Sequence, residues 1–173
     1  VLKTDPKAKG FYKKYAELVM NSKAKNEEVV AVLNAGISAG EADGSMYETL
    51  ASIYSKQGNH TQAVQMYEKA SQLDPKNIAL LSSLAESQAK SGNVNGAILT
   101  YEQAVAMNPQ ASKEYKVLGD LYKKSKKDEA AIKNYKKYLE KNADNALAQQ
   151  IGEYALEQKN YSEAIKYLGK VDG

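Results

Sequence analysis

The segment YEKASQLDPKN at residues 67–77 returns in altered form as YEQAVAMNPQA at residues 101–111. In both copies a Tyr-Glu pair is followed by an Ala three residues after the Tyr and by a Pro after Asp or Asn. The copies stand 34 positions apart, and the alanines near the start of each copy keep steps of 34, 34 and 33, at Ala63, Ala97, Ala131 and Ala164. An internal period of this length indicates a stacked repeat array.

Each unit of the repeat combines two helical patterns. In residues 44–77 the first pattern has positions i, i+3, i+4 and i+7 on one helix face, at Tyr47, Leu50, Ala51 and Tyr54. Gly58 then interrupts the pattern, as a glycine after a helix does. A second face follows at Ala63, Tyr67 and Ala70. Asp74-Pro75 ends it, because proline supplies no N–H and restrains the residue before it. The sequence therefore predicts helix, tight turn, helix and turn.

The pattern resembles the tetratricopeptide repeat family, whose unit has an aromatic residue, a Leu-small pair and a Tyr in the first helix. Its second helix has small and aromatic residues before a closing Pro. Residues 44–77 carry this pattern at Tyr47, Leu50, Ala51, Tyr54, Gly58, Ala63, Tyr67, Ala70 and Pro75. Units 78–111 and 112–144 keep it with departures, notably Gln88 at a Tyr place and Tyr138 at a small-residue place. The resemblance implies an all-α, right-handed superhelical solenoid of stacked helix-turn-helix repeats.

We expect a single array over residues 1–173, with weaker units at both ends. Residues 9–43 fit a degenerate repeat, and residues 145–173 fit an incomplete C-terminal repeat. Residues 1–8, VLKTDPKA, look like the tail of a preceding repeat, because LKTDP is similar to SQLDP at residues 71–75. We therefore expect the chain to be a piece of a longer array. The alternative is a chance Asp-Pro in an irregular tail.

Residue usage argues against several classes of function. The chain has no Cys and one His, which argues against a His-based catalytic triad, a thiolate site and a multi-histidine metal site. All 24 basic residues are Lys and the net charge is only +3, which argues against a nucleic-acid reader. No apolar run approaches the roughly 18 residues that a membrane span needs. We expect no enzyme, cofactor or metal site within these residues, and the compartment stays open between bacterial cytoplasm and envelope.

The resemblance also implies where a partner would bind. First helices of the family line a concave groove that typically holds a partner peptide, so their non-core places would face the partner. These places are Glu48, Ser52, Ser55, Ser82, Glu86, Lys113, Lys116, Asp120, Lys123, Gln149 and Glu153. The leading hypothesis is a non-catalytic protein-interaction module or scaffold that binds a peptide or subunit there. Two alternatives stay open: a scaffold that self-associates through exposed array ends, and a docking or regulatory segment of a larger enzyme.

Lysines gather in residues 112–145, where ten Lys stand against six acidic residues. One interpretation is a solvated surface, since charge runs commonly serve solubility. The other uses Lys113, Lys116 and Lys123, whose steps of 3 and 7 place them on one helix face. The resemblance makes that face part of the groove. On this hypothesis a partner segment carrying Asp or Glu docks there.

Gln88 is a polar residue at a core-type place, where Tyr54 and Tyr122 stand in other units. Two interpretations follow from its chemistry. Its amide is buried and hydrogen-bonded, which is the usual condition of buried polar groups and the interpretation we favour. Alternatively, the place opens to the groove and Gln88 contacts a ligand.

Overall fold

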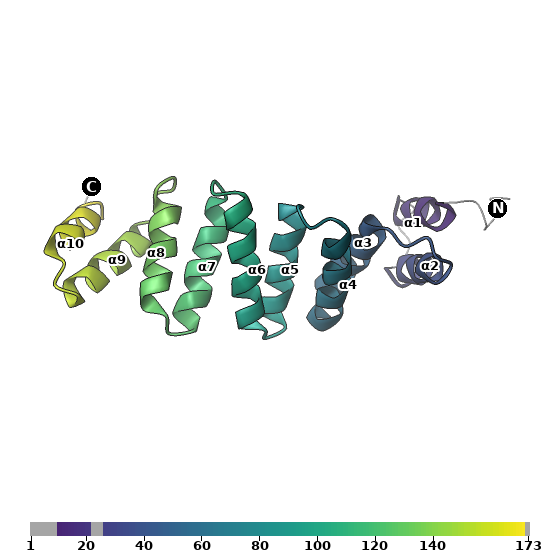
Figure 1. Cartoon of the computed structure of the whole chain (residues 1–173), viewed down its shortest axis with the longest axis horizontal. Helices are drawn as coiled ribbons and strands as arrows, with labels where there is room; N and C mark the ends of the chain where they lie inside the picture. The colour runs from purple at the N-terminus through teal and green to yellow at the C-terminus, as the bar shows by residue number, and fades with distance from the viewer. Residues whose placement is uncertain (1–9, 22–25, 172–173) are drawn as a thin grey trace. The chain divides into compact units, whose positions relative to one another are not determined.

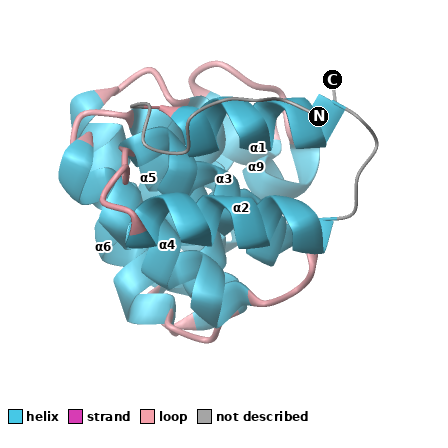
Figure 2. Cartoon of the chain, turned by 90° about the vertical axis from the view of Figure 1, so that its right-hand side faces the viewer, coloured by secondary structure: helices cyan, strands magenta, loops and turns pink. Residues whose placement is uncertain are grey.

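The computed structural model describes residues 10–21 and 26–171, and within these residues the chain is all-α (Figure 1). Figure 2 shows helices joined by short loops, with no strand among the residues that it colours. Consecutive helices pack as antiparallel pairs in the manner of tetratricopeptide repeats, so the predicted fold class is confirmed. Residues 1–8, predicted to be the tail of a preceding repeat, lie outside the described residues.

The described residues belong to two compact units, one ending at Thr100 and the other beginning at Tyr101. The N-terminal unit contains α1 (Phe11–Asn21), α2 (Asn26–Ser38), α3 (Gly44–Lys56), α4 (His60–Leu73) and α5 (Ile78–Lys90). Helix α6 (Val94–Met107) begins in this unit and ends in the next. The C-terminal unit contains α7 (Ser112–Lys124), α8 (Asp128–Leu139), α9 (Asn145–Glu157) and α10 (Tyr161–Leu168). The prediction of a single array stays a prediction.

In three of the helix pairs, the first helix (α3, α5 or α9) begins at a side chain that caps its free N–H groups. Asp43 accepts a hydrogen bond from the backbone of α3, Asn77 from that of α5, and Asp144 from that of α9. Asp and Asn are favoured at this position because their oxygens satisfy donors that have no partner within the helix. These polar residues therefore set where the helices start, and the apolar stripes determine which face becomes buried.

Each unit has a core made from the stripes that the sequence predicts. In the N-terminal unit, α2 and α3 pack through one buried cluster, which contains Val29, Leu33, Met46, Leu50 and Ile53. Helices α4 and α5 meet in a second cluster, which contains Ala63, Tyr67, Ala70, Leu80 and Leu84. In the C-terminal unit, α8, α9 and α10 share a cluster, which contains Ile132, Tyr135, Leu147, Ile151 and Tyr167. Within each unit, a helix pair thus buries its stripe partly against the next helix of that unit, as stacked repeats do.

In the four helix pairs from α3 to α10, the tight turn between the two helices has one left-handed residue at the same repeat position. Gly58 and Gly92 have φ of +79° and +94° there. Lys126 and Lys159 occupy the equivalent places and have φ of +57° each. Lysine rarely adopts this conformation, because the Cβ approaches the following carbonyl oxygen. The turn geometry is therefore kept in the later pairs even though the glycine is absent.

Gln88 is buried, and the Thr100 hydroxyl donates a hydrogen bond of 2.9 Å to its Oε1. The prediction of a buried, hydrogen-bonded amide is confirmed. The predicted core tyrosines divide into two groups. Tyr67, Tyr101 and Tyr135 are buried, whereas Tyr47, Tyr54, Tyr115 and Tyr122 are half-buried.

Candidate functional site

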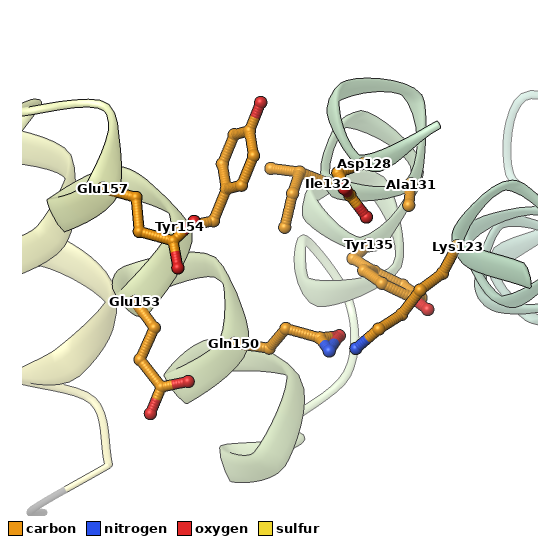
Figure 3. Close-up of a pocket in the computed structure, with 9 residues that line it drawn as sticks. All are labelled: Lys123, Asp128, Ala131, Ile132, Tyr135, Gln150, Glu153, Tyr154 and Glu157. Carbon is orange, nitrogen blue, oxygen red and sulfur yellow. The ribbon is translucent and has the colours of Figure 1, made fainter. Parts of the chain in front are cut away.

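A pocket of about 260 Å³ opens in the C-terminal unit where α7, α8 and α9 meet (Figure 3). Its lining comes from all three helices and comprises Lys123, Asp128, Ala131, Ile132, Tyr135, Gln150, Glu153, Tyr154 and Glu157. Two of these, Lys123 and Glu153, are residues that the sequence predicts for the partner-binding groove. The fold therefore brings together one predicted residue from α7 and one from α9.

The pocket combines an apolar wall with charged groups around it. Ile132 and Tyr154 lie side by side between α8 and α9, and Tyr154 packs against the buried cluster that contains Ile132 (Figure 3). The amino end of Lys123 and the amide of Gln150 point toward one another across the pocket (Figure 3). Glu153 and Glu157 follow along α9. Such a site offers an apolar surface, one cation and several carboxylates to a visiting side chain.

Lys116 has a partner within the chain, which changes the expected role of this predicted groove residue. Its Nζ lies 2.7 Å from Asp144 Oδ2 and 5.2 Å from the centroid of the Tyr138 ring. Asp144 also caps α9 by accepting a hydrogen bond of 3.1 Å from the Leu147 N–H. The ion pair with Lys116 and this cap lower the pKa of the Asp144 carboxyl below its ordinary value. Lys116 therefore ties α7 to the start of α9.

Asp120 also has an internal partner. Tyr135 is a buried residue of α8, and its hydroxyl donates a hydrogen bond of 2.9 Å to Asp120 Oδ1. Burial raises the pKa of Tyr135 well above its ordinary value, and the negative charge of Asp120 raises it further. The tyrosine therefore stays protonated and donates throughout the physiological range. The Asp120 carboxylate gives the Tyr135 hydroxyl a hydrogen-bond acceptor, and this bond contributes to the packing of α7 on α8.

The other predicted groove residues divide between the two units. In the C-terminal unit Lys113 is exposed on α7, and the Gln149 amide donates a hydrogen bond of 2.8 Å to Glu153 on α9. In the N-terminal unit Glu86 forms an ion pair of 2.6 Å with Lys90 on the same helix. The remaining residues are exposed Glu48 and half-buried Ser52, Ser55 and Ser82. Whether these residues contact a partner stays a prediction.

Sequence reasoning missed the pocket residues Gln150, Tyr154 and Glu157. The predicted face of α9 passes through Gln149 and Glu153, but the pocket face passes through positions 150, 153, 154 and 157. Consecutive helical residues differ by about 100° in direction, so an error of one position turns the predicted face toward another neighbour. The i, i+3, i+4, i+7 spacing of these four residues was a signal that could have found them.

Within the described residues, no group of three or more His, Cys, Asp or Glu side chains is arranged to hold a metal ion. None of the described helices is long and apolar enough to cross a membrane.

Helical hairpins of this kind define the chain as an α-helical repeat protein. A family model described as "Tetratricopeptide repeat" matches residues 54–121, and a second model with the same description matches residues 117–145. Together they span just over half of the 173 residues, and the chain therefore belongs to the tetratricopeptide repeat family. Proteins of this family typically mediate protein–protein interactions. The comparison with curated protein sequences gives no significant match.

Solved structures of repeat proteins resemble nearly the whole chain. A crystal structure of MamA has a TM-score of 0.76 and 20% identity, over 94% of this chain and 89% of that one. A MamA fragment (41-end) from Desulfovibrio magneticus RS-1 has a TM-score of 0.70 and 18% identity, over 92% and 90%. PilF from Pseudomonas aeruginosa has a TM-score of 0.63 and 16% identity, over 93% and 73%. At these identities the proteins share the fold.

Proposed function

We propose that this protein is a non-catalytic protein-interaction module that holds a segment of a partner protein against α7 and α9. The observation that carries the proposal is the pocket between α7, α8 and α9, whose lining combines Lys123 and Glu153 with the apolar side chains of Ile132 and Tyr154. A pocket of about 260 Å³ suits one large side chain of a partner rather than a whole small-molecule ligand, since ligand pockets usually hold about 300–1,000 Å³. The partner would bind as an extended or helical peptide.

The charge of the partner segment follows from which lysines are available. Lys113 and Lys123 are exposed on α7, and they support a partner with an acidic residue beside the pocket. Lys116 supports it less, because its charge is compensated by Asp144. Asp128, Glu153 and Glu157 would repel a second acidic group in the pocket itself. We propose a segment that places an apolar or aromatic side chain in the pocket and an acidic residue near Lys123.

The test is a selection from a random peptide library displayed on phage, followed by affinity measurements on synthetic copies of the enriched peptides. Lys123→Glu should weaken binding of acidic peptides, with an effect that shrinks at high salt, because exposed ion pairs are screened. Tyr154→Ala should weaken binding through lost apolar contact. The matched control is Lys133→Glu, which changes an exposed lysine of α8 outside this pocket. Equal effects of Lys123→Glu and Lys133→Glu would contradict the proposed site.

A second candidate function is a self-assembling scaffold, and a separate observation favours it. Helices α1 and α10 each expose large apolar side chains, notably Leu18 and Ile165. Exposed apolar side chains gathered on one helix often mark a surface that binds another protein, and a second copy of this chain is one such partner.

A further inference from the structure

The turn between α7 and α8 contains a cluster of lysines, at the lower ends of these helices in Figure 1. We call residues 123–127, with the sequence KKSKK, the lysine turn, and all four of its lysines are exposed. The equivalent segments of the other three pairs from α3 to α10 contain one lysine each, and these are residues 55–59, 89–93 and 156–160. The dipole of α7 favours lysine in its last turn, but this explains only Lys123 and Lys124. The repeat fold alone therefore does not account for the cluster.

The charge of the lysine turn has no carboxylate to balance it. None of its four lysines forms an ion pair with a carboxylate anywhere in residues 10–21 and 26–171. By contrast, Lys90 in the equivalent turn of α5–α6 pairs with Glu86 on its own helix. The Nζ of Lys127 lies 5.9 Å from the centroid of the Tyr122 ring, a contact that leaves its charge in place. The four ammonium groups repel one another, and an anionic ligand would relieve that repulsion.

The lysine turn adjoins the pocket that carries the proposed function. Lys123 belongs to the turn and also lines the pocket, and Asp128, directly after the turn, lines it as well. Glu153 and Glu157 occupy the opposite side of the pocket, along α9, where they repel an acidic residue (Figure 3). A partner segment with its apolar anchor in the pocket therefore has the lysine turn beside it on one side and carboxylates on the other.

We propose that the partner segment carries a run of acidic residues beside its apolar anchor, and that this run lies over the lysine turn. This inference rests on the proposed function and names the chemistry of its partner: consecutive Asp or Glu, rather than a single acidic residue near Lys123. One exposed ion pair changes affinity by about fivefold at most, whereas several pairs side by side multiply their effects and speed association. The run gives a role to Lys124, Lys126 and Lys127, which do not line the pocket.

An anionic membrane surface is another ligand that four lysines could attract, and the neighbours of the turn argue against it. Asp128 and Glu129 follow the turn directly, and both are exposed. A flat anionic surface would meet these carboxylates together with the lysines and would be repelled by them. A peptide can place its acidic side chains on the lysines alone. An acidic protein segment is therefore the occupant that the charges favour.

The experiment titrates the isotope-labelled full chain with synthetic peptides and follows the backbone amide shifts by NMR, which detects weak binding and locates it. Each peptide has one Phe as the anchor, Gly and Ser as filler, and zero, one, two or four consecutive Asp. The Asp residues precede the Phe in one series and follow it in the other. In the tighter series, each Asp should raise affinity by about two- to fivefold at low salt, and the gain should shrink as salt rises. The shifted amides should include residues 123–127.

Two variants separate binding from folding. Lys124→Gln, Lys126→Gly and Lys127→Gln together should weaken binding of the four-Asp peptide by about tenfold and leave binding of the peptide without Asp unchanged. Lys126→Gly alone should weaken binding of the four-Asp peptide by about two- to fivefold, although glycine suits the left-handed conformation of this residue better than lysine does. A variant that gains stability and loses affinity has not lost it through unfolding.

The matched control removes three exposed lysines of the same unit outside the turn, by Lys133→Gln, Lys141→Gln and Lys170→Gln, so the net charge changes equally. It should bind every peptide as the wild type does. Equal losses in both triple variants would overturn the acidic run. An affinity that depends on Phe and on Tyr154 but not on Asp would also overturn it, and would leave the pocket standing. Binding of none of the peptides would overturn the proposed function itself.

Vesicles test the membrane alternative. The wild type and the triple variant of the lysine turn are each sedimented with vesicles of phosphatidylglycerol and phosphatidylcholine at physiological salt. We expect the wild type to bind no more than the variant does. Vesicle binding that the wild type shows and the variant loses would overturn the acidic segment as the occupant and would assign the turn to an anionic lipid surface.

Discussion

The helix pairs α3–α4 and α7–α8 are two copies of the repeat, 68 residues apart, and they have different side chains at equivalent positions. Where α3 has Ala51, α7 has Gly119, and where α4 has Ala70, α8 has Tyr138. A Cβ added at Gly119 would lie 2.2 Å from the Tyr135 ring. In the second pair the Tyr135 ring therefore lies so close to α7 that only a glycine fits at position 119.

The equivalent tyrosines of the two pairs also have different polar partners. Burial raises the pKa of Tyr67, and a hydrogen bond with Ser83 of α5 opposes the rise. The Tyr135 hydroxyl instead bonds to Asp120 of its own pair. The Tyr67 hydroxyl thus bonds to the next pair, whereas the Tyr135 hydroxyl bonds within its own pair. The ion pairs Lys116–Asp144 and Lys136–Glu163 supply the polar links from α7–α8 to the next pair. The comparison teaches that one repeat pattern permits two ways of joining neighbouring pairs.

The largest effect is expected from a change that disrupts the close contact between Gly119 of α7 and the Tyr135 ring of α8. Gly119→Ala should lower the free energy of unfolding by about 1–3 kcal/mol, because the added methyl group overpacks against the buried Tyr135 ring. This loss outweighs the gain of up to about 1 kcal/mol that alanine brings to a helix interior. Denaturant unfolding measures the difference. The control is Gly44→Ala in α3, where the new Cβ would meet Leu73 at an ordinary 3.7 Å; a comparable loss there would refute the explanation.

A smaller effect concerns the turns of the two pairs. Lys126→Gly should stabilise the protein by up to about 1 kcal/mol. A left-handed lysine costs about 1–2 kcal/mol, and the change removes this strain, but glycine loses more conformational entropy on folding, which offsets part of the gain. In the turn of α3–α4 the opposite kind of change, Gly58→Ala, places a Cβ on a left-handed residue. It should destabilise the protein by about 1 kcal/mol for the same reason. Thermal and denaturant unfolding of both variants test the comparison. Changes of the same sign in both would show that the turn conformation does not decide them.

The smallest effect concerns pH and the link between α7 and α9. The ion pair with Lys116 lowers the pKa of Asp144, so its contribution is present above the ordinary carboxyl pKa near 4 and is lost as pH falls through the lowered value. Asp144→Asn keeps a capping oxygen and removes the charge. This change should lower the free energy of unfolding by about 0–1 kcal/mol at neutral pH and leave it unchanged in strong acid.

A double-mutant cycle with Lys116→Met provides the control for this pair. The double variant should lose little more stability than either single variant, because each change already breaks the same ion pair. Fully additive losses, or a cost of Asp144→Asn that persists in strong acid, would mean that the two side chains act independently.

Local features of the sequence were sufficient for the fold. The 34-residue step located the turns at Gly58 and Gly92, and the helical stripes identified buried residues such as Leu50 and Ile151. These features could be read directly because an amphipathic helix repeats its face every 3.6 residues and a stacked unit repeats its whole pattern. The polar place at Gln88 was also interpreted correctly, since a buried amide needs a partner.

The partners of individual side chains were decided only by the tertiary structure. From the sequence, Lys116 and Asp120 belong to one helix face with Lys123, and all three are predicted to meet a partner protein. In the folded chain Lys116 pairs with Asp144 and Asp120 accepts from Tyr135, while Lys123 lines the pocket with Glu153. A helical period states the direction of a side chain, but its partner depends on residues that are distant in sequence and are brought near only when the helix pairs stack.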